Sequence, residues 1–157
     1  EKVELPERPV TVTRFEALAF RREGDFLDVD VTVDCSSGTY IRSLARDLGE
    51  SLGVGGHLTA LRRTAVGPFL LSDAQPLDAL ESAPRLSLTL DEALARNFPV
   101  LQVNDEEADA LAMGKWLEPR GLEGVHAAVA PDGRAIALVR EKGKRLSTVF
   151  VARPSTL

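Results

Sequence analysis

The sequence predicts a mixed α/β unit followed by a smaller β-rich module, and three observations support this prediction. Residues 26–34 alternate between apolar and polar side chains, which is typical of a half-buried strand. Residues 41–52 carry apolar side chains at three- and four-residue spacing, which is typical of an amphipathic helix. Residues 125–152 contain three short apolar runs separated by glycine-containing turns, which indicates a small antiparallel sheet.

The first part of the chain predicts a hairpin followed by a helix. We expect a strand over residues 10–20, a turn at 22–25 and a second antiparallel strand over 26–34. A small polar turn at 35–39 then leads into the helix, which glycines end near residue 53. Further along, the pattern predicts a short helical piece at 57–61 and an extended run at 64–71.

The second part of the sequence predicts two short helices, followed by a different pattern that begins the β-rich module. The helices are expected at 73–80, with Asp73 as its cap, and at 91–96. Asn104 and Glu107 have the spacing of a capping box, which predicts a helix that runs to about Met113. We place a domain boundary near residue 95, so that the domains are 1–95 and 96–157.

The composition narrows the class of protein. Of the 157 residues, 44% are hydrophobic and 27% are charged, as in ordinary globular domains, which excludes disorder as the main state. No apolar run approaches the roughly 20 residues that a membrane helix needs, so no membrane span is predicted. One cysteine cannot form an intrachain disulfide, which favours the cytoplasm. The two histidines lie far apart without ligand spacing, so no metal is predicted.

The net charge of −5 hides two basic regions. Residues 39–69 contain four arginines against two acids, and residues 134–153 contain six basic residues against one acid. Such local basic surfaces are compatible with an RNA partner but do not require one.

The turn before the first helix contains the most informative candidates. Arg42 falls in the first helical turn, where the helix dipole disfavours a cation, so a carboxylate or a phosphate could be its partner. A surface arginine beside a packed Tyr40 explains the pattern equally well. The adjacent Arg62 and Arg63 are also ambiguous, because one could meet a phosphate or both could be solvated.

Cys35 and His57 could in principle form the nucleophile pair of a thiol hydrolase. We favour the structural interpretation, in which the cysteine is a small packed residue and the histidine has no catalytic role.

Two long segments carry a family resemblance. Val33–Gly49, which reads VDCSSGTYIRSLARDLG, and Gly55–Phe69, which reads GGHLTALRRTAVGPF, resemble the later motifs of TruB-type tRNA pseudouridine synthases. The resemblance covers about residues 5–90, and the C-terminal module resembles a PUA-like RNA-binding domain. It implies half of the α/β (α+β) mixed-sheet domain of the pseudouridine synthase fold, followed by that small domain. The implied reaction isomerises the T-loop uridine at position 55 of tRNA to pseudouridine, without cofactor or metal, on a base flipped out of its stack.

The resemblance also implies roles for individual residues. Arg42 matches the arginine that pairs with the family's catalytic aspartate, Tyr40 a tyrosine that contacts the uracil, and Leu61 an apolar residue of the base pocket. Arg62 and Arg63 are implied to help hold the fold and the RNA backbone. Lys115 and the basic strand pair over residues 134–153 are the implied contacts to the acceptor stem. The tRNA T-arm and acceptor stem are the implied partners.

The family's aspartate motif, of the type Gly-Thr-Leu-Asp-Pro, is not found in the 157 residues. Asp78 lacks the glycine and proline of that motif and follows the later motifs, so it is no replacement. Glu1–Pro9 resembles the middle of the catalytic domain. We therefore expect a C-terminal fragment that is inactive alone, with a non-catalytic RNA-binding chain as the alternative. The intact enzyme is expected to be monomeric, whereas exposed strand edges would favour self-association of the fragment.

Overall fold

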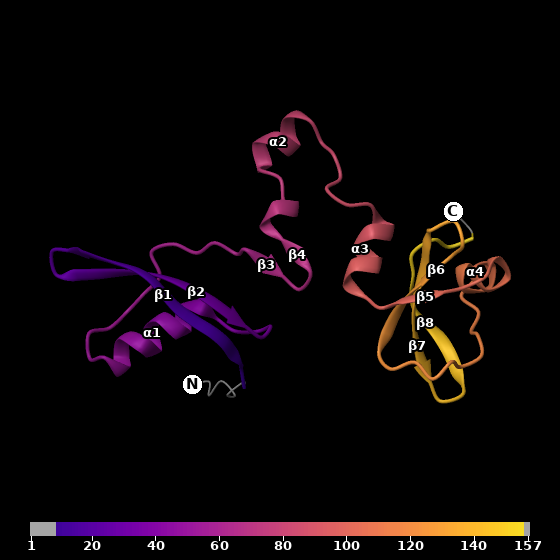
Figure 1. Ribbon diagram of the computed structural model, residues 1–157, viewed down its shortest axis with the longest axis horizontal. Helices are drawn as coiled ribbons and strands as arrows, with labels where there is room; N and C mark the ends of the chain where they lie inside the picture. Colours follow the sequence, from indigo (N-terminus) through magenta and orange to yellow (C-terminus); the bar gives the residue numbers. More distant parts are fainter. Residues whose placement is uncertain (1–8, 156–157) are drawn as a thin grey trace, which may run out of the picture. The chain divides into compact units, whose positions relative to one another are not determined.

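The computed structural model describes residues 9–155, and these form two compact units that divide between Leu61 and Arg62 (Figure 1). The segment Glu1–Pro9, which resembles the middle of the catalytic domain, lies outside the described residues except for Pro9.

The first unit is built on an antiparallel hairpin. Strands β1 (Val12–Glu23) and β2 (Phe26–Cys35) pair along their length, as the alternation predicts. Phe15 lies opposite Val33 on the apolar face. The other face is polar, and Arg21 and Asp30 form an ion pair of 2.6 Å there.

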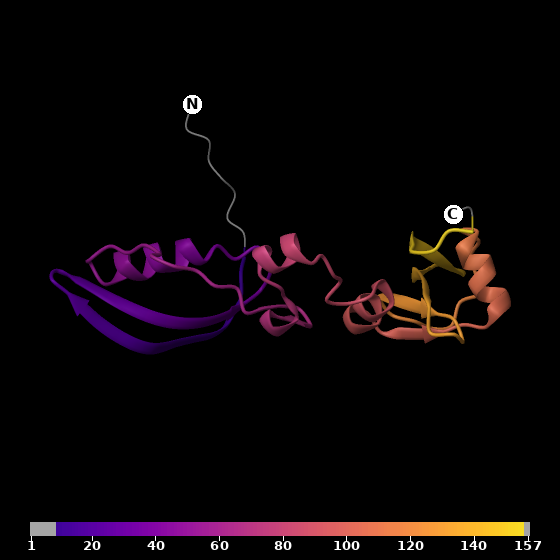
Figure 2. The ribbon, with the colours of Figure 1, turned by 90° about the horizontal axis from the view of Figure 1, so that it is seen from above.

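Helix α1 (Ile41–Ser51) lies along one face of this hairpin (Figures 1 and 2). The loop after the helix folds back so closely that a Cβ on Gly49 would overlap the backbone of Gly55 and Gly56. Glycine is therefore required at Gly49 by packing, because any side chain would push the loop away from the helix.

The second unit begins with short elements. Strands β3 (Ala65–Val66) and β4 (Phe69–Leu70) form a small hairpin within the predicted extended run. The helical piece predicted at 57–61 is wrong, because these residues have no regular structure. The remaining short elements are a 3₁₀ turn, η1 (Leu71–Asp73), and the helices α2 (Leu77–Ser82) and α3 (Leu90–Asn97).

The prediction that Asp73 caps a helix over 73–80 is also wrong. Helix α2 starts only after Pro76, which is its N-cap residue. The Asp73 carboxylate instead accepts a hydrogen bond from the Leu70 N–H at 3.0 Å and pairs with Arg96 at 2.6 Å. A carboxylate that already holds a preceding N–H and a distant arginine is not free to cap the next helix.

A four-stranded sheet closes the second unit. Strands β6 (Val125–Val129), β7 (Ala135–Lys142) and β8 (Arg145–Val151) form the predicted meander, and β5 (Val100–Gln102), which the sequence did not predict, pairs in parallel with β6. Helix α4 (Asp105–Ala112) starts at the predicted Asn104–Glu107 capping box and packs against β7.

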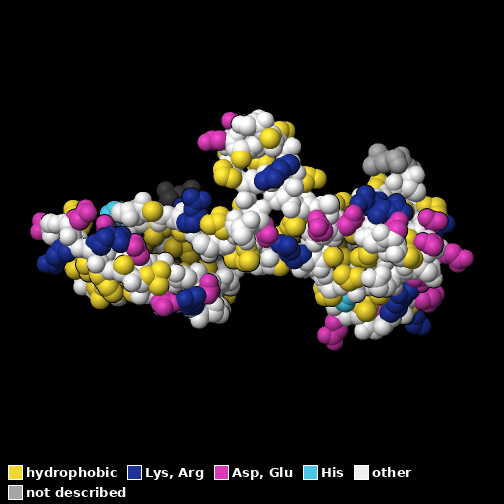
Figure 3. Space-filling view, turned by 45° about the horizontal axis from the view of Figure 1, so that its top comes forward, with side chains coloured by type: hydrophobic (Ala, Val, Ile, Leu, Met, Phe, Trp, Pro, Cys, Tyr) yellow, Lys and Arg dark blue, Asp and Glu magenta, His cyan; other side chains and the backbone are white. Residues whose placement is uncertain are grey.

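The buried core of the described residues lies entirely in this C-terminal part. Leu111, Val139 and Leu146 are its largest fully buried side chains. In contrast, the first unit exposes large apolar side chains such as Phe20, at 66%, and Phe26, at 70% (Figure 3). Exposed apolar surface of this extent is typical of a face that packs against another part of a protein.

The boundary predicted near residue 95 stays a prediction. Helix α3 belongs to the second unit, since Leu94 and Phe98 pack against Ala127 and Val129 of the sheet.

Candidate functional site

The start of α1 is held by a short, tightly bonded loop. The Ser36 N–H donates to the Thr11 carbonyl at 2.8 Å, and the Ser36 hydroxyl accepts from the Thr11 N–H at 3.0 Å. The Thr39 hydroxyl donates back to the Ser36 carbonyl at 2.8 Å. These bonds tie the loop to the beginning of β1 and set the direction of the helix that follows.

Tyr40 and Arg42 come together at this helix start. Tyr40 is the N-cap residue, in extended conformation, and its side chain makes no capping hydrogen bond. The Arg42 guanidinium carbon lies 4.9 Å from the centre of the Tyr40 ring. The two candidate residues therefore form one unit, a cation stacked on an exposed aromatic ring.

The charge of Arg42 has no carboxylate partner among residues 9–155. The first turn of α1 contains no acid, and no ion pair to Arg42 occurs there. One turn later, Arg46 is paired with Asp47 at 2.7 Å and approaches Glu50 at 4.0 Å. Because the helix dipole disfavours a cation at this end, by about 0.3–1 kcal/mol, Arg42 occupies a position that a further anion would stabilise.

The other predicted residues are exposed, and they are divided between the two units. Leu61, 65% exposed, ends the first unit, and Arg62 and Arg63 begin the second. Lys115 follows α4, where its N–H donates to the Ala110 carbonyl at 2.9 Å.

Cys35 and His57 form no hydrogen bond with each other in the part of the chain that the structure describes. His57 is exposed and Cys35 is half-buried. The thiol hydrolase hypothesis gains no support from this geometry.

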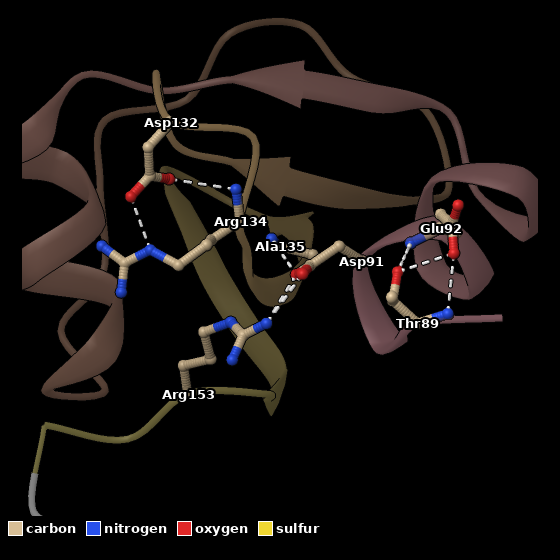
Figure 4. A network of polar contacts seen from close by, with 7 residues as sticks. All are labelled: Thr89, Asp91, Glu92, Asp132, Arg134, Ala135 and Arg153. Carbon is tan, nitrogen blue, oxygen red and sulfur yellow. Dashed lines mark hydrogen bonds and ion pairs between the residues drawn. The ribbon is translucent and has the colours of Figure 1, made fainter. Parts of the chain in front are cut away.

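A polar network in the second unit was missed by the sequence analysis (Figure 4). The Asp91 carboxylate accepts hydrogen bonds from Arg153 at 2.8 and 2.9 Å and from the Ala135 N–H at 2.7 Å. Partial burial alone would raise the pKa of Asp91. The hydrogen bonds and the charges of Arg153 and Arg134 lower it by a larger amount, so the pKa lies below its ordinary value. The network fastens α3 to the sheet.

A groove of about 510 Å³ opens beside this network. Its lining includes Arg134 and Arg153 but also Asp105 and Asp109. The mixed charge makes the groove a poor match for a phosphate.

Trp116 is a second feature that the sequence analysis missed. The residue is 47% exposed, and the Arg145 guanidinium carbon lies 4.7 Å from the centre of its ring. The signal available in the sequence was a single tryptophan directly after Lys115.

Residues 9–155 contain neither a metal-binding cluster nor a membrane-spanning helix. No cluster of three or more histidine, cysteine, aspartate or glutamate side chains is arranged to hold a metal ion there. None of the helices in this range has the length and apolar character needed to cross a bilayer.

Comparisons with known proteins give consistent matches. The family model described as "tRNA pseudouridylate synthase B C-terminal domain" matches residues 42–98, and the one described as "tRNA Pseudouridine synthase II, C terminal" matches residues 98–153. Proteins named tRNA pseudouridine synthase B from Corynebacterium aurimucosum and Corynebacterium diphtheriae are 78% and 70% identical over all 157 residues. The chain spans about half the length of these relatives, 53% and 52% respectively.

A solved structure agrees with the sequence matches. The chain is similar, with a TM-score of 0.74 and 26% identity, to a protein in the "Structure of H/ACA RNP bound to a substrate RNA containing 2'-deoxyuridine". The match covers 94% of this chain and 56% of that chain.

Together with the two-unit fold, these matches define the class: the chain has the C-terminal architecture of a pseudouridine synthase. Within that class it belongs to the TruB-type tRNA pseudouridine synthase family, whose C-terminal region it matches over residues 42–153. The family resemblance and the fold class expected from the sequence are confirmed.

Proposed function

We propose that this chain supplies the C-terminal part of an enzyme that isomerises uridine 55 in the T-loop of tRNA to pseudouridine. The observation that carries the proposal is Arg42, a cation at the start of α1 that stacks on Tyr40 and has no acidic partner among residues 9–155. The names of the relatives, tRNA pseudouridine synthase B, support tRNA as the substrate.

In this proposal Arg42 pairs with a catalytic aspartate that lies in another part of the complete enzyme. A guanidinium within about 4–6 Å of a carboxylate stabilises the ionised form and lowers its pKa. The planar guanidinium can also orient the carboxylate through two parallel hydrogen bonds. The cation–π contact with Tyr40 is worth about 0.5–1 kcal/mol at an exposed site, and it orients the Arg42 side chain even without the carboxylate.

The remaining residues act on the base and the RNA backbone. The reaction breaks the bond between C1′ of the ribose and N1 of the uracil, forms one between C1′ and C5, and moves the C5 proton so that N1 ends protonated. Tyr40 contacts the flipped uracil, and the exposed Leu61 lines its pocket. Arg62, Arg63 and Lys115 contact phosphates of the T-arm and acceptor stem.

The reaction needs no cofactor in this proposal, and the complete enzyme works as a monomer in the cytoplasm. The exposed apolar face of the first unit supports the idea that a further part of the enzyme covers it.

The test uses the complete enzyme with Arg42→Ala and, as a matched control on the same helix, Arg46→Ala. We expect Arg42→Ala to lower the single-turnover rate roughly 100-fold, the cost typical of losing one charge-stabilising group at a reaction centre. The affinity for tRNA should change far less, and Arg46→Ala should leave both nearly unchanged.

Equal losses of rate and affinity in Arg42→Ala would contradict the pairing role. If the complete wild-type protein binds tRNA but forms no pseudouridine, the alternative of a non-catalytic RNA-binding chain holds instead.

A further inference from the structure

Ser36, in the turn before α1, is bonded through all three of its polar groups. Its N–H donates to the Thr11 carbonyl at 2.8 Å, and its hydroxyl accepts from the Thr11 N–H at 3.0 Å. Its carbonyl accepts from the Thr39 hydroxyl at 2.8 Å. The first two bonds join the turn to the residue before β1, and the third closes the turn. Ser36 therefore links the start of the hairpin to the chain that enters α1.

A β-bulge lies directly beside this link. Val12 pairs with Cys35 and Arg14 pairs with Asp34, so Thr13 is an extra residue in β1. Its hydroxyl donates to the Asp34 carbonyl at 3.2 Å. A bulge bends its strand and increases the local twist, and bulges are frequent next to active sites, where they redirect a side chain. The bulge and the bonds of Ser36 together set the direction in which the chain leaves β2.

The turn over residues 36–39 has little freedom of its own. The Thr39 N–H donates to the Ser36 carbonyl at 3.4 Å, which is the bond of a β-turn. Gly38, the third residue of this turn, has a φ of +82°, a conformation that glycine adopts without strain. Since Tyr40 follows directly, the geometry of this turn fixes where α1 begins.

Helix α1 has no cap of its own to fix its first turn. The N-cap residue Tyr40 makes no side-chain hydrogen bond, although a serine, threonine, aspartate or asparagine would usually supply one there. The first turn also contains no acid that would interact favourably with the helix dipole. The positions of Tyr40 and Arg42 therefore depend on the turn that precedes them.

We infer that Ser36 is a positioning residue for the isomerisation: its bonds to Thr11 and Thr39 place Arg42 where the guanidinium meets the catalytic carboxylate. The inference rests on the proposed function, because it gives Ser36 a role that acts only through Arg42. The alignment of reacting groups is sensitive, since a displacement of about 1 Å can lower a rate about 100-fold. Loss of one bond of Ser36 leaves the other two in place, so we expect a smaller displacement and a smaller loss of rate.

The test compares Ser36→Ala with Ser37→Ala in the complete enzyme. Ser37 is exposed in the same turn, and its side chain forms no hydrogen bond among residues 9–155, so it is a matched control. We expect Ser36→Ala to lower the single-turnover rate about 10-fold, a fraction of the loss that a displacement of about 1 Å causes. Ser37→Ala should keep the wild-type rate, and Ser36→Thr, which retains the hydroxyl, should keep most of it.

The affinity for tRNA and the melting temperature separate positioning from a general loss of structure. Ser36 and Thr11 are both exposed, so water can satisfy the Thr11 N–H after the hydroxyl is removed. A water molecule at that place does not hold the turn to the start of β1. We therefore expect Ser36→Ala to leave the tRNA affinity and the melting temperature nearly unchanged while the rate falls.

A double variant tests whether Ser36 acts through Arg42. If it does, Ser36→Ala should lower the rate of Arg42→Ala by less than about 2-fold, because the group that Ser36 positions is already absent. Independent effects would multiply instead, so that the double variant would be about 1,000-fold slower than the wild type.

Three outcomes would overturn the inference. These are a rate of Ser36→Ala equal to that of Ser37→Ala, an equal loss of tRNA affinity and rate, and multiplied losses in the double variant. If Ser36→Ala does not fold, Thr39→Val provides the same comparison, because it removes the bond that closes the turn and keeps the branched side-chain shape. Failure of the proposed function has a different signature, since the complete wild-type enzyme would then form no pseudouridine.

Discussion

Replacing Asp91 with alanine should destabilise the second unit well beyond a typical surface substitution. The Asp91 carboxylate is the meeting point of helix α3, the start of β7 and Arg153, which follows β8. Without it, the Ala135 N–H loses its acceptor and the Arg153 guanidinium loses its partner. The Nε atom of Arg153 is already buried without a hydrogen bond among the described residues, so the side chain has few alternatives.

The expected loss of unfolding free energy can be estimated from the two contacts of Asp91 and their exposure to solvent. A hydrogen bond from a backbone N–H to a charged acceptor is worth about 1.5–3 kcal/mol. The pair with Arg153 adds about 1 kcal/mol or less, because the Asp91 and Arg153 side chains are 27% and 37% exposed and solvent screens their attraction. We expect a total loss of about 2–3 kcal/mol of unfolding free energy. With a urea dependence of about 1–3 kcal/mol per molar, the urea midpoint falls by roughly 0.7–3 M.

The assay is urea unfolding followed by Trp116 fluorescence, since the only tryptophan lies in this unit. The control is Asp132→Ala. Asp132 also accepts a hydrogen bond from the Arg134 N–H, at 3.0 Å, and pairs with the Arg134 side chain, but both side chains are at least half exposed, so water can replace these contacts. The substitution should cost less than about 1 kcal/mol. Equal midpoint shifts for the two variants would refute the reasoning.

The sign of the pH dependence provides a further check on Asp91. Its pKa is lowered in the folded chain, from an ordinary value of 3.8. Its contribution is therefore complete above that ordinary value and disappears as the pH falls through the folded pKa. The stability difference between the wild type and Asp91→Asn should be largest near neutral pH and shrink below about pH 4. A difference that grows on acidification would contradict the assigned shift.

Three further predictions concern activity and packing. The 157-residue chain alone should release no tritium from uridine labelled at C5 in tRNA, because the aspartate motif is not found in it; release would disprove this. Gly49→Ala should destabilise α1 by about 2 kcal/mol, since overlap with Gly55 and Gly56 costs about 3 kcal/mol and alanine's helix propensity returns about 1. Faster hydrogen exchange of the α1 amides would report this loss, and unchanged exchange would contradict it. Cys35→Ser should leave pseudouridine formation by the complete enzyme unchanged, whereas loss of activity in a folded variant would revive the thiol hypothesis.

The sequence predictions were accurate where an element is determined by residues close together in the chain, and they failed where it depends on a distant partner. The hairpin, helix α1 and the Asn104–Glu107 capping box follow from patterns within a few residues, and all three are present. Strand β5 was missed because its three residues become a strand only by pairing with β6, more than twenty positions away. Asp73 was misread because its partner Arg96 is equally remote in the sequence.

The same distinction applies to the candidate site. The contact between Tyr40 and Arg42 lies within one turn of chain, so the sequence could indicate it. The contact between Trp116 and Arg145 depends on the backbone bridge between Leu117 and Leu146, which no local pattern encodes. The residue types alone do not predict this contact either, since a single tryptophan on a surface loop has many structural explanations.

Net charge is a poor guide to this protein because several of its acids already have partners within the structure. Asp73, Asp91 and Glu107 each bind an arginine, and Glu141 holds a loop backbone. The predicted site cations differ from those arginines: within residues 9–155, none of Arg42, Arg62, Arg63 and Lys115 forms an ion pair. The net charge of −5 counts every charged residue equally, whether or not it has a partner within the structure. Sorting the charged residues by partner leaves a set of cations that have no acidic partner among the described residues, so the negative total does not exclude binding of a polyanion.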